Sequence, residues 1–90
     1  MKTFTVIDCY NSVFNHDEGI WEYDVAETDY TVKISTSDTS KTILDKLVKV
    51  GYFAEPIEDD ELEVEWLEND LIVVYFADET YQPVCRLEVR

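Results

Sequence analysis

Only one stretch of this chain repeats its apolar residues at helical spacing, and this limits the fold more than any other feature. The repeat falls at Ile43, Leu44, Leu47 and Val48, which is the period of an amphipathic helix. Residue types that cap helix N-termini fill positions 37–40, and Gly51 suits the residue after a helix C-terminus. The sequence therefore predicts one helix over 41–50.

The remaining pattern has a period of two residues, which is typical of β-strands. Strands are expected at Phe4–Tyr10, Trp21–Val25, Asp29–Ser35, Glu61–Trp66, Leu71–Phe76 and Tyr81–Val89, with turns at Asn15–Gly19, Asn69–Asp70 and Asp78–Thr80. Pro83 places the last strand at a sheet edge or delays its start, because proline has no N–H to donate. The sum is an α+β fold, with about six short strands in the order βββ-α-βββ in an antiparallel-rich sheet and one helix packed on one face.

The composition predicts one acidic domain over residues 1–90, because 46% of the residues are hydrophobic and only two are Gly and two Pro. One helix covers part of such a sheet, so the other face is expected to be solvated, curled on itself or buried, and a homodimer stays open. We see no signal peptide and no membrane span, which predicts a cytoplasmic chain. Cys9 and Cys85 are expected to be reduced and in or near the core.

The charge is strongly negative and unevenly distributed. The 21 acidic and seven basic residues give a formal net charge of −14 at pH 7. Nucleic acids and anionic membranes are bound through Lys and Arg, so direct binding to either is not expected. No Lys or Arg lies between Lys49 and Arg86, a segment that holds eleven acidic residues. The expected partner is a basic protein.

Part of this base-free segment coincides with a predicted strand. Glu61, Glu63 and Glu65 would project from one strand face at intervals of roughly 6.8 Å, close to the spacing of phosphates along a nucleic acid. We therefore predict an inhibitor that occupies the groove of a basic nucleic-acid-binding protein or nuclease as a DNA or RNA mimic. The candidate partner-binding residues are Glu58, Asp59, Asp60, Glu61, Glu63, Glu65, Glu68 and Asp70. The simpler alternative is a solvated strand face kept acidic for solubility.

A protein-interaction or regulatory module, antitoxin-like or an assembly partner, is the second hypothesis, with the exposed sheet face as its binding surface. Most of the Trp, Tyr and Phe residues fall on inward positions, and we assign them mainly to the core. A Trp or Tyr beside the acidic residues would serve as an interface anchor. Trp66 and Tyr81 are the candidate anchors.

No motif predicts catalysis, a cofactor or a structural metal. The only histidine, His16, stands beside Asp17 in a turn-like segment, and neither cysteine has a sequence neighbour that would activate it. Residues 58–61 lack the spaced acids and central Gly of a calcium loop, so only weak cation binding is expected. We expect no enzyme and no cofactor. A small enzyme that uses His16 with Asp17 or a cysteine is a third hypothesis.

In its short length, its pI near 4.1 and its base-free acidic segment, the chain resembles the small acidic proteins that phages and other mobile elements use against host defences. Anti-CRISPR proteins and anti-restriction DNA mimics belong to this group. Locally, Asp29–Ser35 is similar to a strand segment of one anti-CRISPR family that inhibits a CRISPR nuclease, and the rest of the chain departs from that family. The resemblance implies inhibition of a nuclease by blocking its nucleic-acid channel.

Overall fold

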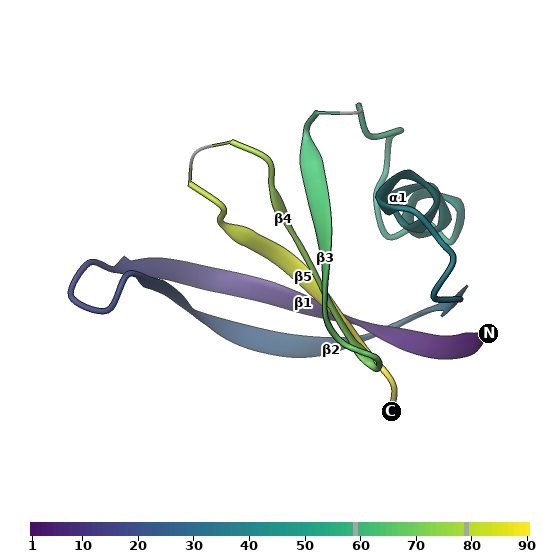
Figure 1. Cartoon of the computed structure of the whole chain (residues 1–90), viewed down its shortest axis with the longest axis horizontal. Helices are drawn as coiled ribbons and strands as arrows, with labels where there is room; N and C mark the ends of the chain where they lie inside the picture. Colours follow the sequence, from purple (N-terminus) through teal and green to yellow (C-terminus); the bar gives the residue numbers. More distant parts are fainter. Residues whose placement is uncertain (59, 79) are drawn as a thin grey trace.

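The computed structural model describes residues 1–58, 60–78 and 80–90. Over these residues, five antiparallel strands form one sheet in the order β2-β1-β5-β4-β3, and one helix packs against it. In chain order the elements are β1 (Lys2–Asn15), β2 (Ile20–Ile34), α1 (Ser40–Lys49), β3 (Leu62–Glu68), β4 (Leu71–Phe76) and β5 (Pro83–Glu88). The predicted α+β class is confirmed. Figure 1 shows α1 on one side of a twisted sheet and the tip of the β1–β2 hairpin on the opposite side.

The two strands expected at Trp21–Val25 and Asp29–Ser35 form a single strand, β2, so the sheet described here has five strands where we expected about six. The pairing of β1 with β2 shifts register beside Thr28, whose hydroxyl donates a hydrogen bond of 2.7 Å to the carbonyl of Val6. Such an irregularity changes which side chains share a face. In the sequence, the alternation of apolar and polar residues breaks at this point, and we therefore predicted two strands instead of one.

The hydrophobic core lies between α1 and one face of the sheet. Ile43, Leu44 and Leu47 of the helix pack against buried strand residues, which alternate with less buried ones along β4 and β5. These buried strand residues are Phe4, Val6, Val32, Ile34, Leu62, Ile72, Val74, Cys85 and Leu87. Trp66 joins them from β3, with its ring edge-on to Phe4 at a centroid distance of 5.9 Å.

Local capping defines the ends of α1, and the predicted boundaries are correct to one residue. The N-cap is Thr39, whose side chain accepts a 3.2 Å hydrogen bond from the amide of Thr42. Gly51 follows the C-cap with φ of +94°, a left-handed conformation that glycine adopts without a steric penalty. With ten residues, α1 is the one helix in the described part of the chain and is too short to cross a bilayer.

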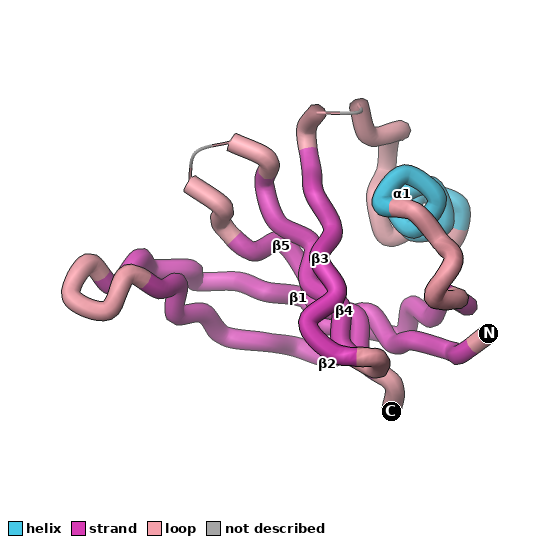
Figure 2. The backbone as a smooth tube through the Cα atoms, in the orientation of Figure 1, coloured by secondary structure: helices cyan, strands magenta, loops and turns pink. Residues whose placement is uncertain are grey.

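The last strand begins at Pro83, which confirms the expected late start. It nevertheless lies at the centre of the sheet, between β1 and β4. A proline is tolerated there because it is the first residue of the strand, where the loss of one N–H interrupts little of the ladder. Figure 2 shows β5 running down the view towards the C-terminus.

The β1–β2 hairpin contacts a distant part of the chain at its far end. Its turn forms as expected: the side chain of Asn15 accepts hydrogen bonds from the amides of Asp17 and Glu18, and Gly19 has φ of +70°. Next to the turn, Nε1 of Trp21 donates a 2.7 Å hydrogen bond to the carbonyl of Thr80. The face away from α1 is therefore partly covered by the molecule's own hairpin.

Candidate protein-binding surface

The acidic row expected along residues 61–65 follows an edge of the sheet, because β3 is the last strand of its strand order. Glu63 pairs with Tyr75 and Glu65 with Val73, on the face opposite the core residues Leu62 and Val64. Glu61 precedes the strand, and its carbonyl accepts a 3.1 Å hydrogen bond from the amide of Ala77. All three glutamates are exposed. We call Glu61, Glu63 and Glu65 the acidic row.

The other candidate residues lie at the two ends of this row. Glu58 and Asp60 are exposed in the loop before β3, and Asp59 lies outside the described residues. Glu68 ends β3 and is exposed. Asp70, in the turn between β3 and β4, forms an ion pair with Lys2 at the start of β1. The structure thus brings seven of the eight candidates to one sheet edge and its flanking loops, with Asp70 already paired inside the chain.

The acidic row has no side-chain cation as a partner within the described residues. The ion pairs among these residues include Lys2–Asp70, Lys46–Asp38, Arg86–Glu88 and Arg90–Glu88. Arg86 of β5 lies on the same face as Glu65, two strands away, and its Nε is 3.2 Å from Oε2 of Glu88. Among the described side chains, the hydrogen bond to a carboxylate of the row comes from the hydroxyl of Tyr75, 3.3 Å from Oε2 of Glu63. The row therefore faces solvent as uncompensated negative charge.

Sequence reasoning missed a second base-free segment, although the same count of Lys and Arg would have found it. No Lys or Arg lies between Lys2 and Lys33. This segment carries seven acidic residues: Asp8, Asp17, Glu18, Glu22, Asp24, Glu27 and Asp29. It forms most of the β1–β2 hairpin, and β2 is the other edge of the sheet. The contact of Trp21 with Thr80 joins the two base-free segments in space.

The lysines gather on the opposite side of the molecule. Lys41, Lys46 and Lys49 lie on α1, and Lys33 lies near the end of β2 that leads into it. Figure 1 places α1 and the N-terminus together on the side away from the hairpin tip. The fold therefore separates the basic residues of the helix from the acidic hairpin.

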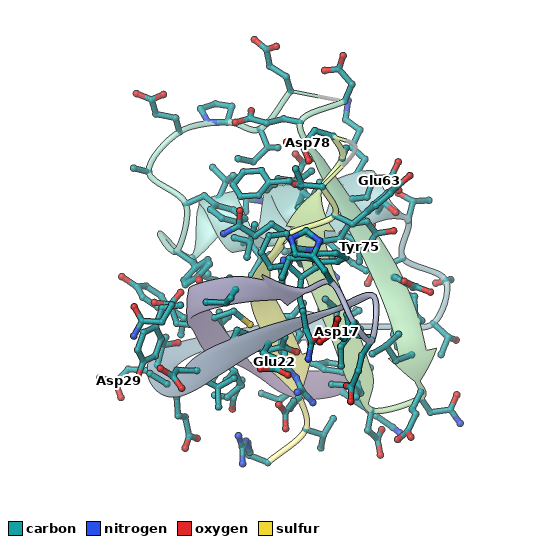
Figure 3. The ribbon with its side chains drawn as sticks, turned by 90° about the vertical axis from the view of Figure 1, so that its left-hand side faces the viewer. Asp17, Glu22, Asp29, Glu63, Tyr75 and Asp78 are labelled. Carbon is teal, nitrogen blue, oxygen red and sulfur yellow. The ribbon has the colours of Figure 1, made fainter. Side chains whose placement is uncertain are left out.

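A groove of about 470 Å³ lies between the hairpin and β3–β5, on the face away from α1. Its lining residues are Ile20, Trp21, Tyr23, Glu65, Leu67, Val73, Tyr75, Tyr81 and Pro83. A second hollow of about 520 Å³ shares Trp21 and Tyr81 with it and extends to His16 in the hairpin turn. We call the first hollow the aromatic groove. Figure 3 shows Glu63 beside Tyr75 on one side of the view, with Asp17 and Glu22 on the hairpin.

Contacts between rings hold the groove side chains in place. Trp21 packs edge-on to Phe14 at 5.4 Å, and Tyr75 packs against Tyr81 at 5.8 Å. Tyr81 has φ of +53° and is 59% exposed, an unusual backbone conformation for a bulky side chain that presents its ring to solvent. Burial, followed by the charges of Glu63 and Glu65, raises the pKa of the Tyr75 hydroxyl.

Assigning the aromatic residues mainly to the core was correct for Phe53, which packs against it, but not for the groove. Tyr81 is exposed, Trp21 and Tyr75 are half-buried, and Tyr75 adjoins the acidic row. Trp66, in contrast, is half-buried on the core side of the sheet, opposite the groove. Sequence could not separate these cases, because the groove exists only where the hairpin meets the β4–β5 loop.

The candidate catalytic residues are not arranged for nucleophilic chemistry. His16 is exposed and packs on Phe14 at 4.9 Å. Burial raises the pKa of the Cys9 thiol to about 11, and burial also raises the pKa of Cys85. Both thiols are therefore protonated at neutral pH.

The described residues contain no group of three or more His, Cys, Asp or Glu side chains placed to hold a metal ion.

The fold defines the class of this chain as α+β, with one antiparallel sheet and one helix over the described residues. Comparison with protein-family models, with curated proteins and with solved structures gives no match.

Proposed function

We propose that this chain is a non-catalytic inhibitor that binds a basic nucleic-acid-binding protein or nuclease, in the manner of an anti-CRISPR protein, and occupies its groove as a DNA or RNA mimic. The observation that carries the proposal is the acidic row, which lies on an exposed edge strand without a cationic partner in the described residues. Arg and Lys side chains that normally contact phosphates form equally short, charge-assisted hydrogen bonds with carboxylates.

The geometry of the row supports this proposal. On β3, Glu63 and Glu65 are held by a ladder of backbone pairs with β4, so their spacing is set before binding. A preorganised row loses less conformational entropy on association than the same charges on a flexible tail. The net charge of −14 adds long-range attraction that raises the association rate with a basic partner at low salt.

The first test is capture of partners from a host lysate by the immobilised chain, at low and at high salt. Recovery of a nuclease or nucleic-acid-binding protein that is lost at high salt and displaced by competing DNA supports the proposal. A salt-resistant partner that binds no nucleic acid, or recovery of the chain alone, contradicts it.

Charge reversal tests whether the row is the contact surface. The double variant Glu61→Lys with Glu63→Lys should weaken binding to the captured partner by about 100-fold, because each reversal replaces an attraction with a repulsion. Asp45→Lys with Glu55→Lys is the matched control, since these exposed residues lie on α1 and in the loop after it. An equal loss in both double variants would indicate that only net charge matters.

The aromatic groove favours a second candidate function, a regulatory or assembly module that binds through this sheet face. Tyr81 is 59% exposed and Leu67 is 52% exposed. An exposed tyrosine such as Tyr81 is a common interface anchor. In this case Tyr81→Ala would weaken binding more than reversal of the acidic row, and high salt would have little effect.

A further inference from the structure

We propose that the aromatic groove binds an arginine side chain presented by an extended segment of the partner protein. This inference rests on the proposed function, because it names the partner chemistry that meets the acidic surface. Glu65 belongs both to the acidic row and to the lining of the groove. A basic partner that lies along the row therefore brings its cations to the groove entrance.

The side chains that line the groove suit a cation. Trp21, Tyr75 and Tyr81 supply aromatic rings, and rings of this kind attract cations through the negative charge of their faces. Glu65 supplies a carboxylate next to them. A purely apolar occupant would remove Glu65 from water without compensating its charge, which is costly. An anionic occupant would be repelled by Glu65 and Glu63.

The raised pKa of Tyr75 reflects burial first and then negative charge at the groove, as expected for a site that binds a cation. Its hydroxyl donates to Glu63, and burial together with the charges of Glu63 and Glu65 raises its pKa. The groove lining includes no Lys or Arg among the described residues, and Arg86 on the same face is paired with Glu88. The negative charge at this end of the groove is therefore available to an incoming cation.

Arginine fits this combination better than lysine. A planar guanidinium stacks on an aromatic ring and still points its N–H groups sideways to a carboxylate. A lysine ammonium is a compact, strongly hydrated charge that does not stack. The hollow beyond Trp21 and Tyr81 continues the groove towards the hairpin turn, which leaves room there for the peptide chain that carries the arginine.

The test is a titration of the intact ¹⁵N-labelled chain with a blocked Gly-Arg-Gly-Arg-Gly peptide at low salt, followed by NMR. The two tryptophans give two indole N–H signals, and Trp66 lies on the core side as an internal control. The indole signal of Trp21 should shift with added peptide, whereas that of Trp66 should not. A peptide with lysine in place of both arginines should bind several-fold more weakly. A peptide with the neutral arginine analogue citrulline at both positions should show no measurable binding.

Two variants assign the contact. Glu65→Gln keeps the shape of the side chain and should weaken binding of the arginine peptide about tenfold. Asp45→Asn removes the same charge on the α1 side and should leave binding nearly unchanged. Tyr81→Ala should weaken binding through loss of a ring, and Tyr81→Phe should restore it. An unchanged melting temperature shows that each variant is folded.

Equal shifts with the arginine and citrulline peptides, or equal effects of Glu65→Gln and Asp45→Asn, would overturn the groove assignment. This result is distinguishable from failure of the proposed function. If the arginine peptide binds as expected but no captured partner is displaced by DNA, arginine binding in the groove is supported and nucleic-acid mimicry is contradicted. If DNA displaces the partner while the peptide leaves Trp21 unchanged, mimicry stands without the groove.

Discussion

At the scale of single residues, strand alternation separates the two cysteines. Asp8 pairs with Cys85 across β1 and β5, so these two side chains share the face that packs against the core. Cys9 follows Asp8 and therefore points to the opposite face. Two cysteines on opposite faces of one sheet cannot form a disulfide without a change in the backbone. We therefore expect both thiols to remain free under oxidising conditions.

The reactivity of Cys9 should be low at neutral pH and should rise steeply in alkali. Burial raises its pKa from 9.0 to about 11, so at pH 8 its thiolate population is about 100-fold smaller than in the unfolded chain. Modification by a thiol reagent should slow by about that factor and accelerate until the pH approaches 11. The measurement is the rate of thiol modification of the native chain as a function of pH. The rates of the Cys9→Ala variant and of the urea-unfolded chain serve as comparisons. Reaction of Cys9 as fast as a small free thiol at pH 8 would contradict the prediction.

At the scale of elements, the segment before α1 ties the helix to the end of β2. Asp38 accepts 2.8 Å hydrogen bonds from the amide of Ser35 and from the ammonium of Lys46, and a third from the hydroxyl of Thr42. The hydrogen bond from Lys46, followed by that from Ser35, lowers the pKa of Asp38 below its usual 3.8. The ionised carboxylate is therefore part of the folded arrangement.

Asp38→Asn should lower the melting temperature at pH 7. A lowered pKa adds stability above pH 3.8, and this stability is lost as the pH falls through the folded-state pKa. The difference in melting temperature between the wild type and Asp38→Asn should therefore become smaller below pH 3.8. Melting curves of both proteins across the acid range give the result, with the exposed Asp45→Asn as the control. A difference that stays constant down to the lowest pH would show that charge on Asp38 is not involved.

Elements defined by local chemistry were predictable, and those that depend on a neighbour were not. The boundaries of α1 follow from Thr39 and Gly51, which act on their own turn of the chain. The continuity of β2 through Thr28 depends on hydrogen bonds to β1, which no pattern within β2 records. The acidic row was predictable from alternation alone. The aromatic groove was not, because it needs the contact between Trp21 and Thr80.

At the scale of the whole molecule, the excess of negative charge opposes folding, because the folded state brings 21 acidic residues into a small volume. Added NaCl should therefore raise the melting temperature, with much of the rise complete near 0.15 M, where the screening length is about 8 Å. Thermal melts over a series of salt concentrations measure this. The double variant Asp45→Lys with Glu55→Lys should respond less, since its net charge is smaller. A melting temperature that is flat or falls with NaCl would contradict the prediction.

The lysines around α1 and the tip of the base-free hairpin lie at opposite ends of a molecule 38 Å long. Centres of positive and negative charge that do not coincide give the molecule a permanent electric dipole. In the field of a cationic protein such a dipole experiences a torque, so the chain turns its hairpin side forward while it is still in solution. Orientation would then precede contact. Lysine substitutions on α1, across the sheet from the aromatic groove, would change how quickly a complex forms and leave its lifetime unaltered.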